Sequence, residues 1–224
     1  MLAPADMNRF YLGFSFLPAL AALAGCAGEG GLEQSRINPA CAPTDLSCVV
    51  AGFSAPLAEG ATVPVDVQLD LQGSAAPTLE LVSGNPEVFE VEGQRLRGAR
   101  AGVAALLVMA PGELVLDFLH IWVAQPSALL LHRRSEGGAE TGPLPGKVQL
   151  LQGDELTVSV EPYARSQRLM GELESTWATD PAVVEVLENG AFNQRRLVAR
   201  APGATTLQVS ALTLDTSLEL EVLP

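Results

Sequence analysis

The feature that most constrains the fold is an internal repeat of about one hundred residues. Three pairs of segments match in the same order along the chain. The pairs are residues 60–67 (GATVPVDV) with 153–160 (GDELTVSV), 85–91 (NPEVFEV) with 180–186 (DPAVVEV), and Gly102 with Gly203. Their offsets are 93, 95 and 101 residues, and this slow growth is typical of duplicated modules with loop insertions. The 224 residues therefore accommodate two small domains of similar fold.

Apolar and polar side chains alternate between the turn residues, which is the pattern of a strand with one buried face. The clearest strands are predicted over residues 62–71, 204–211 and 218–222. Pro64 lacks a backbone N–H, which favours a sheet edge for the first of them. No window of eleven residues after Cys26 has a 3.6-residue period. The chain is therefore predicted to be all-β with almost no helix.

The repeated motif resembles the group-2 bacterial immunoglobulin-like domain found in intimin-type adhesins. In the second repeat the matching residues are Gly153, Trp177, Asp180, Pro181, Val183, Val186, Ala199, Gly203, Ala204 and Val209. In the first repeat they are Gly60, Asn85, Pro86, Val88, Val91, Ala99, Gly102 and Ala104, with Val82 in the place of the tryptophan. The resemblance implies two tandem immunoglobulin-like β-sandwich domains, which we place at residues 53–125 and 126–224.

Trp177 is the largest apolar side chain of the second motif, and we expect it to lie in a core otherwise built from Leu and Val. Substitution Trp177→Ala would then cost about 3–5 kcal/mol, the usual penalty for truncating a buried aromatic residue.

The first thirty residues have the layout of a secretory signal, with Arg9, an apolar run over residues 10–22 and then small residues. The run is too short for a comfortable membrane span. Residues 23–26, Leu-Ala-Gly-Cys, resemble the lipobox of bacterial lipoproteins. The resemblance implies that residues 1–25 are a signal peptide and that Cys26 carries the lipid anchor. Because Ala27 and not aspartate follows, it also implies the outer membrane of the cell envelope.

Two cysteines remain after Cys26, namely Cys41 and Cys48. Six turn-prone residues separate them, so an oxidising compartment favours a local disulfide. Free thiols and a metal site are the alternatives, although no histidine lies nearby in the sequence. Residues 26–52 are rich in Gly, Pro, Ala and polar residues and lack periodicity. They are predicted to form a flexible, lipidated tether.

The composition argues against several classes of function. With 13 basic and 26 acidic residues, the net charge of −13 makes nucleic-acid binding improbable, because such binding depends on neutralising phosphates. The sequence has no P-loop, no Gly-x-Ser-x-Gly, no His-Glu-x-x-His and no Cys-x-x-Cys motif. The two histidines, His120 and His132, fall in different modules. We therefore expect no enzymatic activity and no cofactor.

Acidic residues of the first repeat are a second candidate for a metal site, because some surface immunoglobulin-like arrays bind calcium between modules. These residues are Asp66, Asp70, Glu80, Glu90 and Glu92. No Asp-x-Asp-x-Asp loop accompanies them, so no metal site is predicted.

Residues 114–124 (LVLDFLHIWVA) differ from the other predicted strands because they are apolar on both faces. A strand of this kind needs a cover on each face. One possible cover is the second module, reached through a linker at Pro126. The other is a ligand or partner that contacts a patch of Phe118, His120 and Trp122.

These features together predict a non-enzymatic cell-envelope lipoprotein whose immunoglobulin-like modules serve adhesion, structure or protein binding. Its partners would be membrane lipid, held through Cys26, and a protein. One alternative is an accessory docking subunit of an envelope or secretion complex. Another is a carbohydrate-binding or hydrolytic lipoprotein with a site between the modules, although 5% aromatic residues argue against a sugar-binding face.

Overall fold

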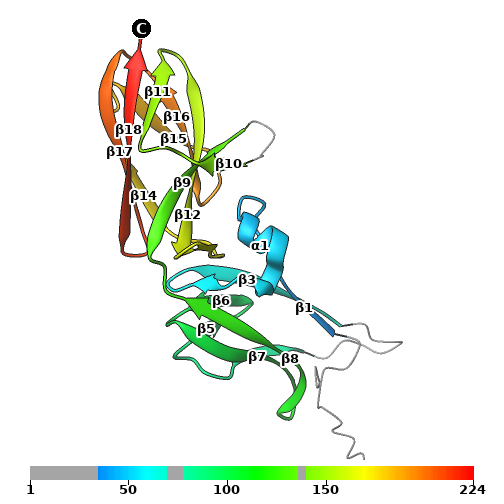
Figure 1. Cartoon of the computed structure of the whole chain (residues 1–224). Helices are drawn as coiled ribbons and strands as arrows, with labels where there is room; N and C mark the ends of the chain where they lie inside the picture. Colours follow the sequence, from blue (N-terminus) through cyan, green and yellow to red (C-terminus); the bar gives the residue numbers. More distant parts are fainter. Residues whose placement is uncertain (1–34, 70–77, 136–139) are drawn as a thin grey trace, which may run out of the picture.

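In the computed structural model, which describes residues 35–69, 78–135 and 140–224, β-strands build two sandwiches joined end to end (Figure 1). The predicted signal peptide over residues 1–25, Cys26 and Asp70 lie outside these residues. Within the described ranges, no helix has the length and apolar character needed to cross a membrane.

Module 1 consists of two sheets with the strand orders β1-β3-β6-β5 and β2-β8-β7-β4. A short helix, α1 (Leu46–Ala51), and a 3-10 turn, η1 (Gly52–Ser54), connect β1 to β2. The strands are β1 (Ser35–Pro39), β2 (Leu57–Ala58), β3 (Thr62–Leu69), β4 (Glu80–Ser83), β5 (Phe89–Glu92), β6 (Arg95–Gly98), β7 (Gly102–Ala110) and β8 (Leu114–Ala124).

Module 2 repeats this topology with the strand orders β10-β9-β12-β16-β15 and β11-β18-β17-β14, and β13 pairs with β12. The strands are β9 (Ala128–Arg134), β10 (Glu140–Pro143), β11 (Lys147–Leu151), β12 (Glu155–Ala164), β13 (Gln167–Arg168), β14 (Ser175–Ala178), β15 (Val184–Glu188), β16 (Gln194–Ala199), β17 (Gly203–Ala211) and β18 (Leu214–Leu223). In both modules the last strand also pairs in parallel with a short early strand, β8 with β2 and β18 with β11. The prediction of an all-β chain with two tandem immunoglobulin-like sandwiches is confirmed.

Alternation along the strands gives each module its own core. In β17, Leu207 and Val209 are fully buried, whereas Gln208 between them is exposed. The equivalent residues of β7, Leu106 and Val108, are also fully buried. Each sheet therefore turns one row of aliphatic side chains inward, as the period of two predicts.

Trp177 lies at the side of the second core and is only partly buried. Its indole Nε1 donates a hydrogen bond to Ser175 Oγ at 2.8 Å, and the Arg195 guanidinium carbon lies 5.7 Å from the ring centroid. Trp177 therefore contributes to the second core as expected, but its ring also makes polar contacts and is not fully enclosed.

The prediction of a flexible tether over residues 26–52 is wrong for its described part, residues 35–52. β1 pairs with β3 as β9 pairs with β12. Pro39 lies opposite Val65, and Arg133 lies opposite Val158, 94 and 93 positions later. Module 1 therefore begins at β1 and not at residue 53. The Pro- and polar-rich composition concealed a strand whose partner, β3, comes later in the same module.

The same pairing corrects the edge assignment of Pro64. β3 lies between β1 and β6, so it is an inner strand. The Pro64 carbonyl accepts a hydrogen bond from Ala40 N at 2.8 Å, just beyond the last β1–β3 residue pair. At the end of a ladder the missing N–H of proline interrupts no pairing.

The modules meet through side chains of module 2 that enter the first core. Leu169 and Met170, which follow β13, are each 1% exposed and pack with the buried residues of module 1. Ala58 N donates to the Met170 carbonyl at 2.9 Å, and Thr62 and Glu172 exchange two backbone hydrogen bonds. The boundary predicted at residue 126 is therefore a packed joint and more than a linker.

Candidate binding surface

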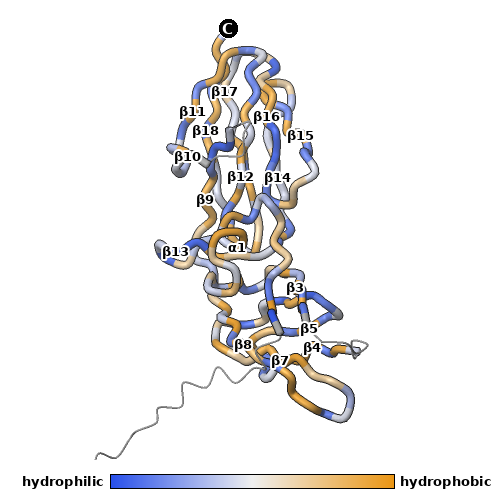
Figure 2. Tube along the Cα trace, turned by 90° about the vertical axis from the view of Figure 1, so that its right-hand side faces the viewer, coloured by the Kyte–Doolittle hydropathy of each residue, from blue (hydrophilic) through white to orange (hydrophobic). Residues whose placement is uncertain are grey.

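The outer face of the β2-β8-β7-β4 sheet gathers exposed apolar side chains. Of the eight large apolar side chains that the described residues expose, four lie in β7 and β8: Val103 (49%), Leu114 (59%), Val115 (45%) and Trp122 (59%). We define the module 1 outer face by its solvent-facing row, Val82, Val103, Ala105, Leu107, Met109, Val115, Phe118, His120 and Trp122. Figure 2 shows the β7–β8 hairpin largely in orange at the end of the molecule opposite the C-terminus.

The structure brings Phe118, His120 and Trp122 together on this face. The Phe118 and His120 rings meet edge to face with centroids 5.9 Å apart. The opposite side of β8, with Ile121 and Val123 at 1% and 5% exposure, is buried in the core of module 1 itself. Module 2 leaves Trp122 exposed, so the expectation that the second module covers this strand is wrong for this face.

The equivalent face of module 2 is polar. Gly102 lies opposite Val123 and Gly203 lies opposite Val222, which aligns the two hairpins residue by residue. In that alignment Phe118, His120 and Trp122 correspond to Ser217, Glu219 and Glu221, and Ala105, Leu107 and Met109 correspond to Thr206, Gln208 and Ser210. The sandwich therefore does not require apolar side chains at these positions.

The β7–β8 hairpin carries further apolar surface at its tip. Val108 lies opposite Asp117 and Met109 opposite Val115, so the register shifts by one residue in a bulge. The turn then leaves the Leu114 and Val115 side chains, both aliphatic, exposed to solvent.

The disulfide between Cys41 and Cys48, whose Cα atoms are 5.5 Å apart, closes a loop that reaches module 2. Asp45 in this loop is 4% exposed and caps α1, with Oδ1 accepting a hydrogen bond from Cys48 N at 3.0 Å. Its Oδ2 accepts from Gly171 N at 2.7 Å. Gly171 has a φ of +118°, and a Cβ there would come within 2.7 Å of Leu57 Cδ1. One carboxylate thus clamps both modules at a site where only glycine fits.

A buried polar network adjoins the loop. Arg134 and Glu161 have side chains 3% exposed, and Nη2 lies 2.5 Å from Oε1. Arg134 Nε also donates to Ser159 Oγ at 2.8 Å. Asn193 Nδ2 donates to Glu161 Oε1 at 3.1 Å and to the Thr44 carbonyl at 3.3 Å. The ion pair of module 2 is therefore linked to the disulfide loop of module 1.

The sequence did not single out these network residues. The available signal was weak, because Arg134 ends β9 directly after Arg133 and Glu161 is the second glutamate of β12. His132, which the sequence did single out, lies beside them at 2% exposure and stacks on Tyr163 with centroids 6.1 Å apart. It belongs to module 2 and does not meet His120.

Burial shifts both carboxyl groups of the joint. It raises the pKa of Glu161 to about 7 against the attraction of Arg168 and Arg134. It also raises the pKa of Asp45, which hydrogen bonds from Cys48 N and Gly171 N partly offset. Both carboxyls are enclosed and hydrogen-bonded, so their arrangement holds the joint and offers no opening to a substrate.

The candidate calcium residues are dispersed. Asp66 lies on β3, Glu80 on β4, and Glu90 and Glu92 on β5. Across residues 35–69, 78–135 and 140–224, no group of three or more His, Cys, Asp or Glu side chains could hold a metal ion.

No protein-family model matches the chain, and no curated protein matches it. Solved structures with a similar arrangement include domains 4 and 5 of the S-layer protein SbsC, with 16% identity over 70% of this chain and 82% of that one and a TM-score of 0.32. The Escherichia coli adhesin FdeC has 13% identity over 84% of this chain and 63% of that one, with a TM-score of 0.34. Yersinia pseudotuberculosis InvD has 13% identity over 75% and 55%, with a TM-score of 0.32. Similarities this weak transfer no function to this chain.

Proposed function

We propose that this chain is a non-enzymatic cell-envelope lipoprotein whose two immunoglobulin-like modules form a stiff arm for adhesion, structure or protein binding. The observation that carries the proposal is the packed joint. Leu169 and Met170 enter the first core, and Asp45 bonds to both modules. A joint sealed by buried contacts holds module 2 in one orientation, which is what a display arm needs and a flexible linker would not supply.

The anchor is proposed from the lipobox, and the cysteine pairing supports it. Cys41 and Cys48 bond to each other, which leaves Cys26 as the remaining thiol of the three. β1 begins at Ser35, nine residues after Cys26. The net charge of −13 is unchanged when residues 1–25 are removed, because Asp6 and Arg9 cancel. Such a charge keeps a displayed sheet protein soluble.

Mass spectrometry of the mature N-terminus tests the anchor. We expect a first peptide that begins at Cys26 and carries a diacylglyceryl group. Cys26→Ser is the control and should accumulate as an uncleaved, unlipidated precursor. A wild-type peptide that begins before Cys26 and has a free thiol would contradict the anchor.

Cross-linking in intact cells tests the binding role. A photoreactive residue is placed at Gln208 or Ser217, which are exposed on module 2. The control is a lipoprotein with the same residues 1–34 fused to an unrelated domain. We expect an envelope protein linked to the chain and absent from the control. Identical patterns of abundant proteins in both samples would count against the proposal.

A further inference from the structure

We propose that the module 1 outer face and the β7–β8 hairpin tip lie against the lipid surface that holds the chain. This inference rests on the proposed lipid anchor at Cys26. It assigns the exposed apolar patch to the bilayer and leaves module 2 to contact proteins.

The repeat indicates which way the hairpin tip points. In module 2, Leu212 lies at the tip of the β17–β18 hairpin and packs against both cores. Its Cδ2 is 3.1 Å from the point where a Cβ on Gly60 would lie. The tip of module 2 therefore faces the preceding module. The β7–β8 tip of module 1 is its topological equivalent, so it faces the N-terminal side, where Cys26 lies in the sequence.

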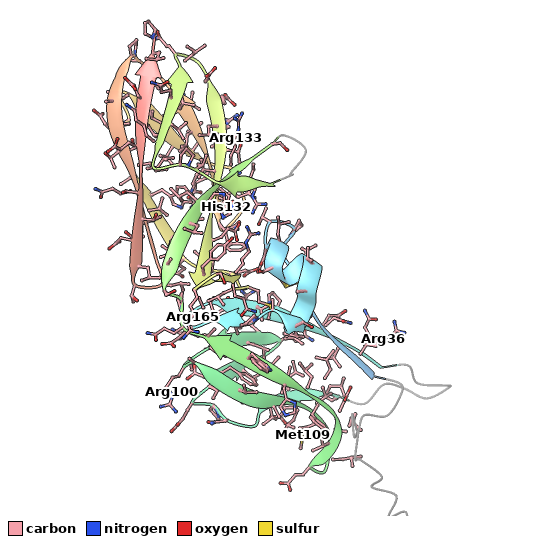
Figure 3. All side chains as sticks on the ribbon, in the orientation of Figure 1. Arg36, Arg100, Met109, His132, Arg133 and Arg165 are labelled. Atoms are coloured by element: carbon pink, nitrogen blue, oxygen red, sulfur yellow. A yellow bond between two sulfur atoms is a disulfide. The ribbon has the colours of Figure 1, made fainter. Side chains whose placement is uncertain are left out.

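The views of the molecule agree with this direction. Figures 1 and 2 both place β7 and β8 at the end remote from the C-terminus. Figure 3 shows Arg36 at the start of β1 and Met109 near the hairpin tip, both on the half of the molecule away from module 2. β1 and β8 also approach each other in the fold.

The length of chain before β1 keeps this end near the bilayer. Nine residue steps separate Cys26 from Ser35. Even fully extended they span at most about 30 Å. The start of β1, and with it the N-terminal end of module 1, is therefore held within about 30 Å of the surface that carries Cys26.

The chemistry of the face fits a lipid interface. Trp122 and Phe118 are aromatic residues of the kind that settle at the headgroup level, and Leu114 and Val115 add aliphatic surface at the tip. The face has no cluster of basic side chains among the described residues, and Glu80 and Glu113 are exposed beside it. Binding is therefore driven by apolar contact and does not require anionic lipids.

The two tryptophans provide a test with a built-in control. Trp122 lies on the proposed contact face, and Trp177 lies in module 2. The lipoprotein is reconstituted into phosphatidylcholine vesicles with or without brominated acyl chains, which quench nearby tryptophans. In Trp177→Phe, where only Trp122 emits, we expect brominated lipid to reduce emission by about half, as for an interfacial side chain. In Trp122→Phe, where only Trp177 emits, we expect no change.

A second comparison keeps the test sharp if Trp177→Phe folds poorly. The fluorescence quenched in the wild type, minus that quenched in Trp122→Phe, also isolates the contribution of Trp122. Leu114→Ser combined with Val115→Ser should reduce this difference, whereas Thr206→Ser with Ser217→Ala on the module 2 face should not. Adding phosphatidylglycerol should not increase the quenching.

Failure of the anchor and failure of the docking are separable. The chain from Cys26 onward keeps every described residue, and its Cys26 thiol can be coupled to a maleimide lipid while Cys41 and Cys48 remain paired. Quenching of Trp122 in this coupled form supports the docking even if cells do not lipidate Cys26. Equal emission from Trp122 in plain and brominated vesicles, with the lipid attached, overturns the proposal.

Discussion

Modules 1 and 2 have the same strand order, but the outer face of module 1 is apolar and that of module 2 is polar. Where β8 carries Phe118, His120 and Trp122, β18 carries Ser217, Glu219 and Glu221. The inner rows remain aliphatic in both, for example Leu106 and Leu207. The two sandwiches share the aliphatic residues that face inward. The residues that face outward can therefore differ according to what each module contacts.

One strand position at the joint reverses the contrast, because there module 2 buries an ion pair and module 1 does not. Glu161 of β12 corresponds to Gln68 of β3 at the repeat offset of 93. Glu161 is 2% exposed and paired with Arg134, whereas Gln68 is exposed. The same strand position is thus a buried ion pair where a neighbouring module covers it and a surface amide where none does.

The largest expected effect is on this ion pair. Arg134→Ala leaves the Glu161 carboxylate buried without its main partner, so it should lower the free energy of unfolding by about 3–5 kcal/mol. Gln68→Ala at the equivalent position should change it by less than about 0.5 kcal/mol. Urea unfolding followed by Trp177 fluorescence measures both. Similar costs for the two variants would show that the joint does not distinguish the modules.

A pH titration of stability sharpens the same comparison. Because the pKa of Glu161 is about 7 in the folded chain and near 4.5 when unfolded, folding favours its protonated form. Its contribution is fully present below pH 4.5 and is lost as the pH rises through about 7, with a ceiling of roughly 3 kcal/mol. Glu161→Gln should remove this loss. The quantity to measure is the difference in unfolding free energy between wild type and Glu161→Gln from pH 4 to pH 8, and a constant difference would refute the shift.

The two tryptophans give the smallest contrast. Trp177 is partly buried, so Trp177→Ala should cost about 2–3 kcal/mol, less than the 3–5 kcal/mol of an enclosed aromatic residue. Trp122 is 59% exposed, and Trp122→Ala should cost about 0.5 kcal/mol or less. Thermal unfolding followed by circular dichroism compares them. A cost above about 1 kcal/mol for Trp122→Ala would mean that the outer face supports the fold, contrary to its assignment as a contact surface.

Local patterns in the sequence predicted what depends on near neighbours. The alternation over residues 62–71 and 204–211 predicted β3 and β17. Residues 114–124, which are apolar on both faces, predicted β8 as a strand with one apolar face outside its own core. The sequence misassigned β1, because a five-residue strand rich in polar residues is recognisable only beside β3. The joint was missed for the same reason, since Asp45 and Gly171 have no local pattern that links them.

The clamp at Asp45 also has a consequence for the order in which the chain folds. Asp45 and Gly171 are 126 residues apart, and Thr44 and Asn193 are 149 apart. Contacts of such long sequence separation form late, because the intervening chain must first be ordered. Thr44 and Asp45, near the start of the folded region, therefore make these hydrogen bonds only after most of module 2 has been synthesised. The two modules then become rigidly joined in one last step and not module by module.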